Sequence, residues 1–232
     1  VGVTVAVNAP ATEANVISVL GNAVKAAAPA DVDTVAELNT LASIVDRLMQ
    51  VANGVDPATL TPALTPSDLA KIGLTGIDVT NLPAVLSKIA STDDTGAALT
   101  DLAALQTLAT TAIAAQAKIK AYAEANSGPI PVVADFEAIG LTVPGPAIST
   151  HGEATQAQYL EFIQTALAST QITGAKADTP AKLQATITAA QHVLDAANGV
   201  ANDIINPVTK ADLFALGLDP AKLTIDGTIT FL

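Results

Sequence analysis

The chain has 232 residues, of which 50% are hydrophobic but only 3% aromatic, and it carries a formal net charge of −12. That charge would repel phosphate backbones and anionic lipid surfaces, so nucleic-acid binding is disfavoured. The chain contains no Cys, which excludes disulfides, thiolate zinc sites and Cys nucleophiles. The absence of Cys fits a reducing compartment and a secreted bacterial protein equally.

A short motif recurs in which Asp stands five residues before a Gly that is flanked by aliphatic residues. The copies are Asp68–Leu74, Asp135–Leu141 and Asp212–Leu218, and Val1-Gly2-Val3 resembles a truncated copy. Repeats spaced by about 70 residues are typical of a tandem array of small domains. Because the chain begins inside a repeat, we expect it to be part of a longer or processed polypeptide.

The repeat and the helical patterns predict an all-α fold of tandem three-helix-bundle modules of about 70 residues in an elongated array, with short β segments at the ends. The predicted divisions are helical repeats at 1–64, 65–128 and 129–206, then a short helix of a next repeat with a strand-like tail at 207–232.

The first repeat begins with an alternating segment, Thr4–Val7, that is typical of a strand. A helix then starts near Asn15, and a long helix follows that Thr34 and Glu37 cap as a capping box. Its apolar stripe is Leu38, Leu41, Ile44, Val45, Leu48 and Val51. The only arginine of the chain, Arg47, lies on this helix beside Asp46, and we expect it in a surface ion pair.

The second repeat opens with Thr65 as the N-cap of a short helix, which Gly73 ends in a left-handed conformation. Asn81 or Thr80 is expected to cap the next helix, and a long helix runs from Thr95 to Ala125. In every copy the recurring Asp falls in the first turn of a short helix. We interpret it as a capping residue rather than as a functional acid.

The third repeat places Tyr159, Phe162, Ile163 and Ala166 on one helix. Asp178-Thr179-Pro180 then caps a long helix whose stripe is Leu183, Ile187, Ala190, Leu194 and Ala197. The alternating tail Leu223–Leu232 predicts a strand, which could pair with the edge of another chain.

Few residues of the chain suggest chemistry. His151 and His192 lack the i, i+4 spacing of a zinc pair, and we interpret both as structural. The pairs Asp31/Asp33 and Asp93/Asp94 have two interpretations, as calcium ligands or as helix caps. There is no Gly-rich phosphate loop and no Gly-x-Ser-x-Gly elbow. The sequence therefore predicts a protein that is not an enzyme, with no cofactor unless calcium binds.

The apolar run Leu102–Ala117 is shorter than the roughly 20 residues that a membrane-spanning helix needs. We therefore expect no membrane span in this segment.

Three stretches carry a resemblance to a known group of proteins: Gly73–Val85, Asp33–Leu38 and Asn206–Leu218. They resemble the Ala/Thr/Asp-rich helical tandem repeats of large bacterial surface and secreted adhesin-like proteins, many of them biofilm-associated. The resemblance implies an extracellular location on the bacterial cell surface and a role as spacer, stalk or adhesive segment. Its implied partners are other surface or matrix proteins, and it carries over no catalytic residue.

Two alternatives to a spacer remain open at this point. One is a self-assembling surface-layer or filament subunit that contacts copies of itself. The other is a helical module that binds a glycan or a host protein through Tyr122, Tyr159 and Phe162. At helical spacing, however, these aromatic residues are more typical of a core.

Overall fold

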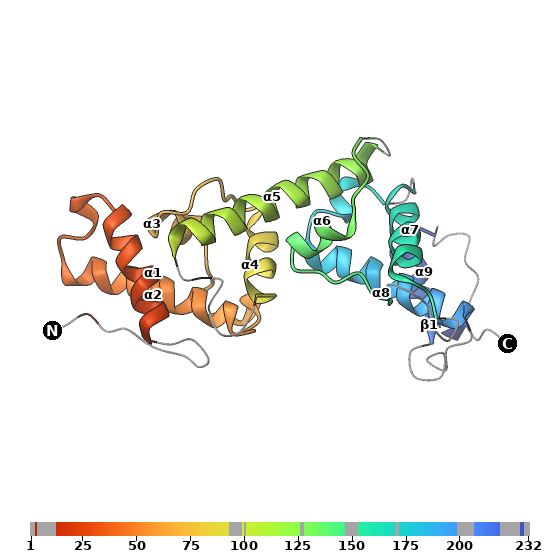
Figure 1. Cartoon of the computed structure of the whole chain (residues 1–232), viewed down its shortest axis with the longest axis horizontal. Helices are drawn as coiled ribbons and strands as arrows, with labels where there is room; N and C mark the ends of the chain where they lie inside the picture. Colours follow the sequence, from red (N-terminus) through yellow and green to blue (C-terminus); the bar gives the residue numbers. More distant parts are fainter. Residues whose placement is uncertain are drawn as a thin grey trace. The chain divides into compact units, whose positions relative to one another are not determined.

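The structure is a computed structural model of the 232-residue chain, and the described residues are 3, 13–92, 99, 101–125, 128–146, 153–169, 172–198, 207–218 and 228–229 (Figure 1). They are mostly helical, which confirms the all-α class. The chain divides into two compact units. Unit 1 comprises Val1–Ala114 and Ala138–Gly140, and unit 2 comprises Ala115–Glu137 and Leu141–Leu232. The predicted boundaries after residues 64, 128 and 206 stay predictions.

Along the described chain, a helix of medium length is followed by a long helix and then by a short one, and this order occurs three times. We call these groups the first, second and third helix sets. They are α1 (Glu13–Ala26), α2 (Val35–Ala52) and α3 (Pro66–Lys71); α4 (Leu82–Ala90), α5 (Leu102–Ala125) and α6 (Val133–Ala138); and α7 (Gln156–Leu167), α8 (Pro180–Ala197) and α9 (Lys210–Ala215).

The connections contain three-residue 3-10 turns, which are η1 (Pro29–Asp31), η2 (Pro57–Thr59) and η4 (Gly174–Lys176). A two-stranded ribbon pairs β1 (Val208–Thr209) antiparallel to β2 (Thr228–Ile229), with Val208 opposite Ile229. The strand predicted in the tail is therefore confirmed at residues 228–229, and its partner lies in the same chain. The strand predicted at Thr4–Val7 lies outside the described residues.

In unit 1, α2 packs against α1, α3 and α4. The predicted stripe of α2 supplies the core: Leu41, Ile44, Val45, Leu48 and Val51 are buried, and Leu38 is half-buried. Since one helix face carries all these side chains, their removal from water drives the packing. The Thr34/Glu37 capping box is confirmed, with both reciprocal hydrogen bonds present.

In unit 2, α8 packs against both α7 and α9. The predicted α8 stripe is confirmed at Leu183, Ile187 and Ala190 but is wrong at its end, where Ala197 is exposed. Asp195 and Ala196 occupy the buried positions instead. Because α8 packs against two helices, its buried surface is wider than one stripe and includes positions on other sides of the helix.

Helix α5 ends at Ala125, as predicted, but begins at Leu102 rather than at Thr95. Asp101 precedes it and accepts a hydrogen bond from the Ala104 N–H at 2.6 Å. A capping carboxylate thus marks the helix start at this position. None of the helices in the described ranges is long and apolar enough to cross a membrane.

The predicted helix stop is confirmed in all three sets. Gly73, Gly140 and Gly217 have φ values of +92°, +80° and +86°, in the left-handed region that favours glycine. The N–H of the leucine after each glycine donates to the residue five positions earlier, as Leu74 does to the Leu69 carbonyl at 3.0 Å. Each short helix therefore ends in a Schellman-type stop.

Candidate functional site

The recurring aspartates are capping residues in the described structure, as predicted. Asp68 Oδ2 accepts the Thr65 N–H at 3.1 Å, and Asp212 Oδ2 accepts the Thr209 N–H at 2.7 Å. Both pairs are full capping boxes. Asp135 Oδ2 accepts the Val132 N–H at 2.6 Å. Valine has no hydroxyl that could accept the Asp135 N–H. The second set therefore has only one of the two hydrogen bonds of a capping box.

Each of these carboxylates also binds a cation or a potential cation on the long helix of its own set. Arg47 Nη1 lies 3.5 Å from Asp68, Lys118 Nζ lies 2.6 Å from Asp135, and His192 Nδ1 lies 3.1 Å from Asp212. The partners are on α2, α5 and α8 respectively. The sequence gives no constant spacing between the paired residues, so these contacts were not predicted.

The expectation of a surface ion pair for Arg47 is wrong. Arg47 is only 8% exposed, and its Nη1 donates to the carbonyl oxygens of Pro62 at 3.1 Å and Ala63 at 3.0 Å. It therefore ties the connection between α2 and α3 to α2. Pro62 and Ala63 lie 15 and 16 residues after Arg47, so a reading of its immediate neighbour Asp46 could not reveal them.

The third pair differs electrostatically from the other two because an imidazole is charged only when it is protonated. Burial is the largest influence on the Asp212 carboxyl and acts to raise its pKa. Hydrogen bonds from Thr209 and His192 outweigh that influence and hold the pKa of Asp212 below its ordinary value. His192 pairs with the capping carboxylate, and its interpretation as a structural residue stays a prediction; His151 lies outside the described residues.

The calcium candidates are only partly in the described structure. Asp31 lies in η1 and Asp33 precedes α2, while Asp93 and Asp94 lie outside the described residues. A hydrogen bond and charge repulsion from Glu37 raise the pKa of Asp33. Among the described residues, no three His, Cys, Asp or Glu side chains gather as a metal-binding group. Calcium binding stays a prediction.

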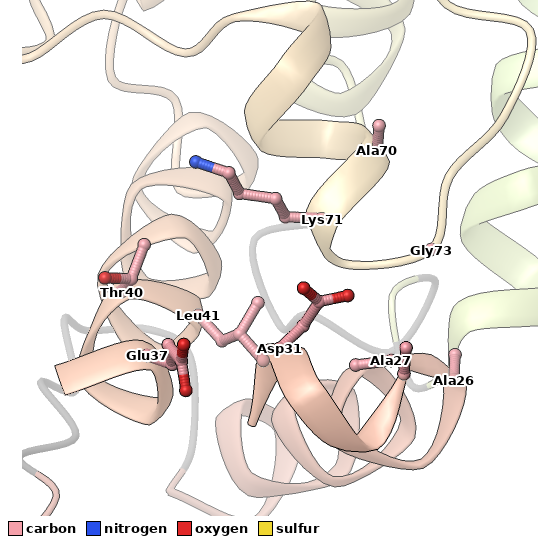
Figure 2. A pocket seen from close by; sticks show the side chains of 10 residues that line it. Ala26, Ala27, Asp31, Glu37, Thr40, Leu41, Ala70, Lys71 and Gly73 are labelled. Atoms are coloured by element: carbon pink, nitrogen blue, oxygen red, sulfur yellow. The ribbon is translucent and has the colours of Figure 1, made fainter. Parts of the chain in front are cut away.

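A pocket of about 440 Å³ in unit 1 contains one of these candidates (Figure 2). Asp31 and Glu37 bring carboxylates to it, Lys71 brings an ammonium group, and alanines with Leu41 and Thr40 form much of the remaining lining. Hydrogen bonds from the hydroxyl and N–H of Thr34 lower the pKa of Glu37, so its carboxylate is engaged in capping α2. The lining includes no Ser, Cys or His that could act as a nucleophile or base beside these acids.

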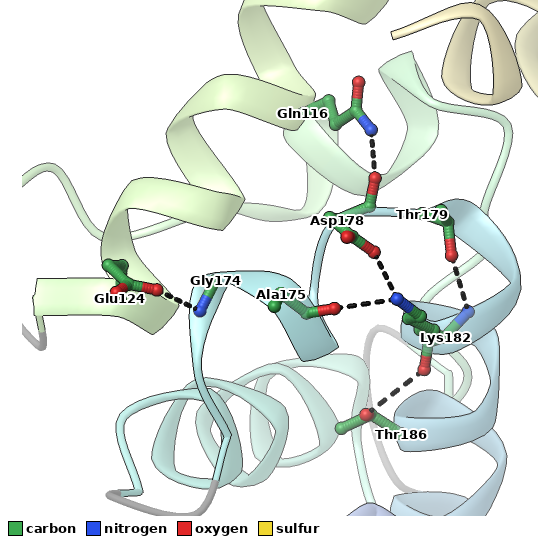
Figure 3. Close-up of polar contacts among 8 residues, drawn as sticks. All are labelled: Gln116, Glu124, Gly174, Ala175, Asp178, Thr179, Lys182 and Thr186. Carbon is green, nitrogen blue, oxygen red and sulfur yellow. Dashed lines mark hydrogen bonds and ion pairs between the residues drawn. The ribbon is translucent and has the colours of Figure 1, made fainter. Parts of the chain in front are cut away.

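In unit 2, polar side chains hold the turn before α8 (Figure 3). The Glu124 carboxylate accepts the Gly174 N–H at 2.6 Å, and the Gln116 side-chain amide donates to the Asp178 carbonyl. Lys182 Nζ pairs with Asp178 Oδ1 at 2.7 Å. The cap of α8 is Thr179, whose hydroxyl accepts the Lys182 N–H. Through these contacts, Asp178 stabilises the turn that precedes α8.

A polar pair in the core of unit 2, Tyr159 with Asp195, was not predicted from the sequence. Tyr159 is 3% exposed, and its hydroxyl donates to Asp195 Oδ1. Burial first, and then the adjacent carboxylate, raise the pKa of Tyr159. Tyr159 therefore cannot contribute to an exposed binding face, which contradicts that part of the glycan- or host-protein-binding alternative. Tyr122 and Phe162 are half-buried.

Comparison of the chain with protein-family models, with curated proteins and with solved structures finds no match.

Proposed function

We propose that this chain is a non-catalytic structural segment, a spacer or stalk built from tandem three-helix modules, in an extracellular protein of the bacterial cell surface. The surface location and the adhesin-like context are supported only by the resemblance in the sequence. The structural role is supported by what the repeated residues do.

One observation carries the proposal. The residues common to the three copies are the ones that start, end and anchor helices: the capping Asp, the left-handed Gly and the leucine after it. In a repeat array, residues that recur in every copy are expected to maintain the structure that all copies share. Here that shared role is helix termination and docking rather than a reaction, which favours a spacer over an enzyme.

A spacer made of modules should gain length in proportion to the number of modules. We expect the largest dimension of a tandem fusion of two chains, measured by small-angle X-ray scattering at low concentration, to be close to twice that of one chain. A fusion whose dimension barely exceeds that of the single chain would overturn the proposal. Millimolar calcium should leave the result unchanged if the aspartates only cap helices.

A further inference from the structure

A pocket occurs at the same place in the first and third helix sets. The first-set pocket, of about 440 Å³, is lined by η1, the first turns of α2 and the end of α3 (Figure 2). The third-set pocket, of about 260 Å³, is lined by η4, the first turns of α8 and the end of α9. One of these sets is followed by another set and the other is preceded by one. The opening is therefore a property of the helix set itself.

Equivalent positions carry opposite charges in the two pockets. The last residue of the 3-10 turn is Asp31 in the first set and Lys176 in the third. The third residue of the long helix is Glu37 in the first set and Lys182 in the third. The threonine caps and glycine stops around these positions are the same in both sets. The lining thus varies within a constant frame, as it does on the binding surfaces of repeat proteins.

The first-set pocket has two charged groups that are available to a ligand. No hydrogen bond or ion pair with another described residue engages the Asp31 carboxylate or the Lys71 ammonium. In the third set, by contrast, Lys182 pairs with Asp178 at 2.7 Å, and Lys176 also has a partner. In Figure 2 the Asp31 side chain comes from η1 and the Lys71 side chain from α3. The first-set pocket therefore presents a negative and a positive group from different elements.

These charges restrict the ligands that fit. Hydrogen bonds from Thr34 lower the pKa of Glu37, so its carboxylate adds a second negative charge at neutral pH. A ligand with only a positive charge would be repelled by Lys71, and one with only a negative charge by the two carboxylates. An uncharged ligand would displace water from all three groups without replacing its hydrogen bonds. A small molecule that carries both an ammonium and a carboxylate group satisfies all three.

The remaining lining favours an aliphatic body for such a molecule. Its side chains are mostly aliphatic: Ala26, Ala27, Ala28, Leu41 and Ala70. Methylene groups that pack against these side chains leave water, which favours binding. The pocket volume of about 440 Å³ is also within the range of roughly 300–1,000 Å³ that is usual for small-molecule sites.

We propose that the first-set pocket binds a small aliphatic zwitterion of the ω-amino-acid class. Its ammonium group binds Asp31 beside Glu37, and its carboxylate binds Lys71. The charges lie at the two ends of the ligand because the groups that bind them lie on different elements. This inference goes beyond the proposed spacer role, since a spacer needs no ligand.

Titration of the isotope-labelled chain with 6-aminohexanoate, followed by NMR, tests the site. We expect the amide signals of Ala27, Thr40 and Lys71 to shift, with a Kd on the order of 1 mM. Hexylamine and hexanoate, which each carry one of the two charges, should bind about tenfold more weakly. The amide signals of Ile172 and Phe214 should not shift, because the third-set pocket is lined by lysines and by no carboxylate.

Two substitutions assign the two charges of the ligand. Lys71→Gln should weaken binding of 6-aminohexanoate about tenfold without weakening that of hexylamine. Asp31→Asn should weaken binding of 6-aminohexanoate about tenfold without weakening that of hexanoate. Both side chains are exposed, so signals away from the pocket should stay unchanged.

Matched controls are Lys120→Gln and Glu161→Gln, at exposed positions of unit 2, which should bind like the unmodified chain. Pocket amide signals that do not shift at about 20 mM 6-aminohexanoate, a concentration well above the expected Kd, would overturn the site. Unchanged binding by both the Lys71→Gln and the Asp31→Asn variants would also overturn it. Neither result affects the scattering test of the spacer, which is made without this ligand.

Discussion

The first and third helix sets end in short helices with the same capping box and the same glycine stop, but the surroundings of the two short helices differ. In the first set the carboxylate of Asp68 meets a buried arginine that also binds two carbonyl groups, and Leu74 is covered. In the third set Asp212 meets a histidine, and Leu218 is exposed. A motif of local bonds therefore specifies the helix ends, while the stability of each end depends on its long-range contacts.

The largest difference is expected from removing the two basic side chains that pair with these aspartates, Arg47 and His192. Arg47→Met should destabilise unit 1 by about 3 kcal/mol, because it leaves the Asp68 carboxylate and two carbonyl groups without their partner. His192→Met should cost unit 2 about 1 kcal/mol, since its imidazole makes one such contact at a more exposed position. Urea denaturation read by hydrogen exchange of α3 and α9 measures both. Equal losses of unfolding free energy in the two variants would contradict the claim that Arg47 stabilises its helix end more than His192 does.

The two leucines after the glycines provide the next test. Leu74→Ala should cost about 3 kcal/mol, as is usual for a buried leucine, because it removes contacts and leaves a cavity. Leu218→Ala should change the free energy of unfolding by less than about 0.5 kcal/mol in dilute solution, because the side chain is half exposed. The same denaturation assay applies, and a large loss for Leu218→Ala would show that α9 is covered in the isolated chain.

The stop of the second set separates backbone strain from packing. Gly140 and Gly54 have similar positive φ values, +80° and +83°, so alanine is strained by about 1–2 kcal/mol at either position. A β-carbon at Gly140 would overlap the Ser87 carbonyl group, whereas at Gly54 it would meet no atom within 4 Å. We expect Gly140→Ala to cost about 2 kcal/mol more than Gly54→Ala. Thermal unfolding of the two variants measures this difference, and equal costs would show that the Gly140 backbone can shift.

The smallest expected effect is a pH dependence at the acid end, in the third set. Burial acts to raise the pKa of Asp212, but hydrogen bonds from Thr209 and His192 outweigh it and lower that pKa below its ordinary value. The contribution of this carboxylate to stability is therefore present above the ordinary Asp pKa and is lost as pH falls through the lower folded value. We expect the protection of α9 amides against hydrogen exchange, corrected for intrinsic exchange, to persist through the ordinary Asp range of about 3.9 and to fall only below it.

Asp212→Asn should remove that acid dependence, because an amide does not titrate in this range. An α9 whose protection follows the same acid profile in both proteins would contradict a role for the Asp212 charge.

The features that the sequence predicted correctly depend on residues a few positions apart. The Thr34/Glu37 box, the glycine stops and the α2 stripe follow from hydrogen bonds and periodicity within one or two turns. The start of α5 was wrong because two caps compete before it, Thr95 and Asp101, and local sequence does not rank them. The end of the α8 stripe was wrong because α8 contacts two helices and Asp195 pairs with Tyr159, so residues off the stripe are buried there.

By itself, the sequence determined where most helices begin and end and which face of α2 is apolar. Those properties depend on capping hydrogen bonds, glycine stops and apolar spacing among residues close together in the chain. Only the tertiary structure decided which cation each recurring aspartate binds, that Arg47 is buried, that Tyr159 meets Asp195 and that β2 pairs with β1. These contacts join residues 15 or more positions apart, the shortest separation being that of Arg47 and Pro62. Their formation depends on how the helices pack, and no local pattern of residues encodes that packing.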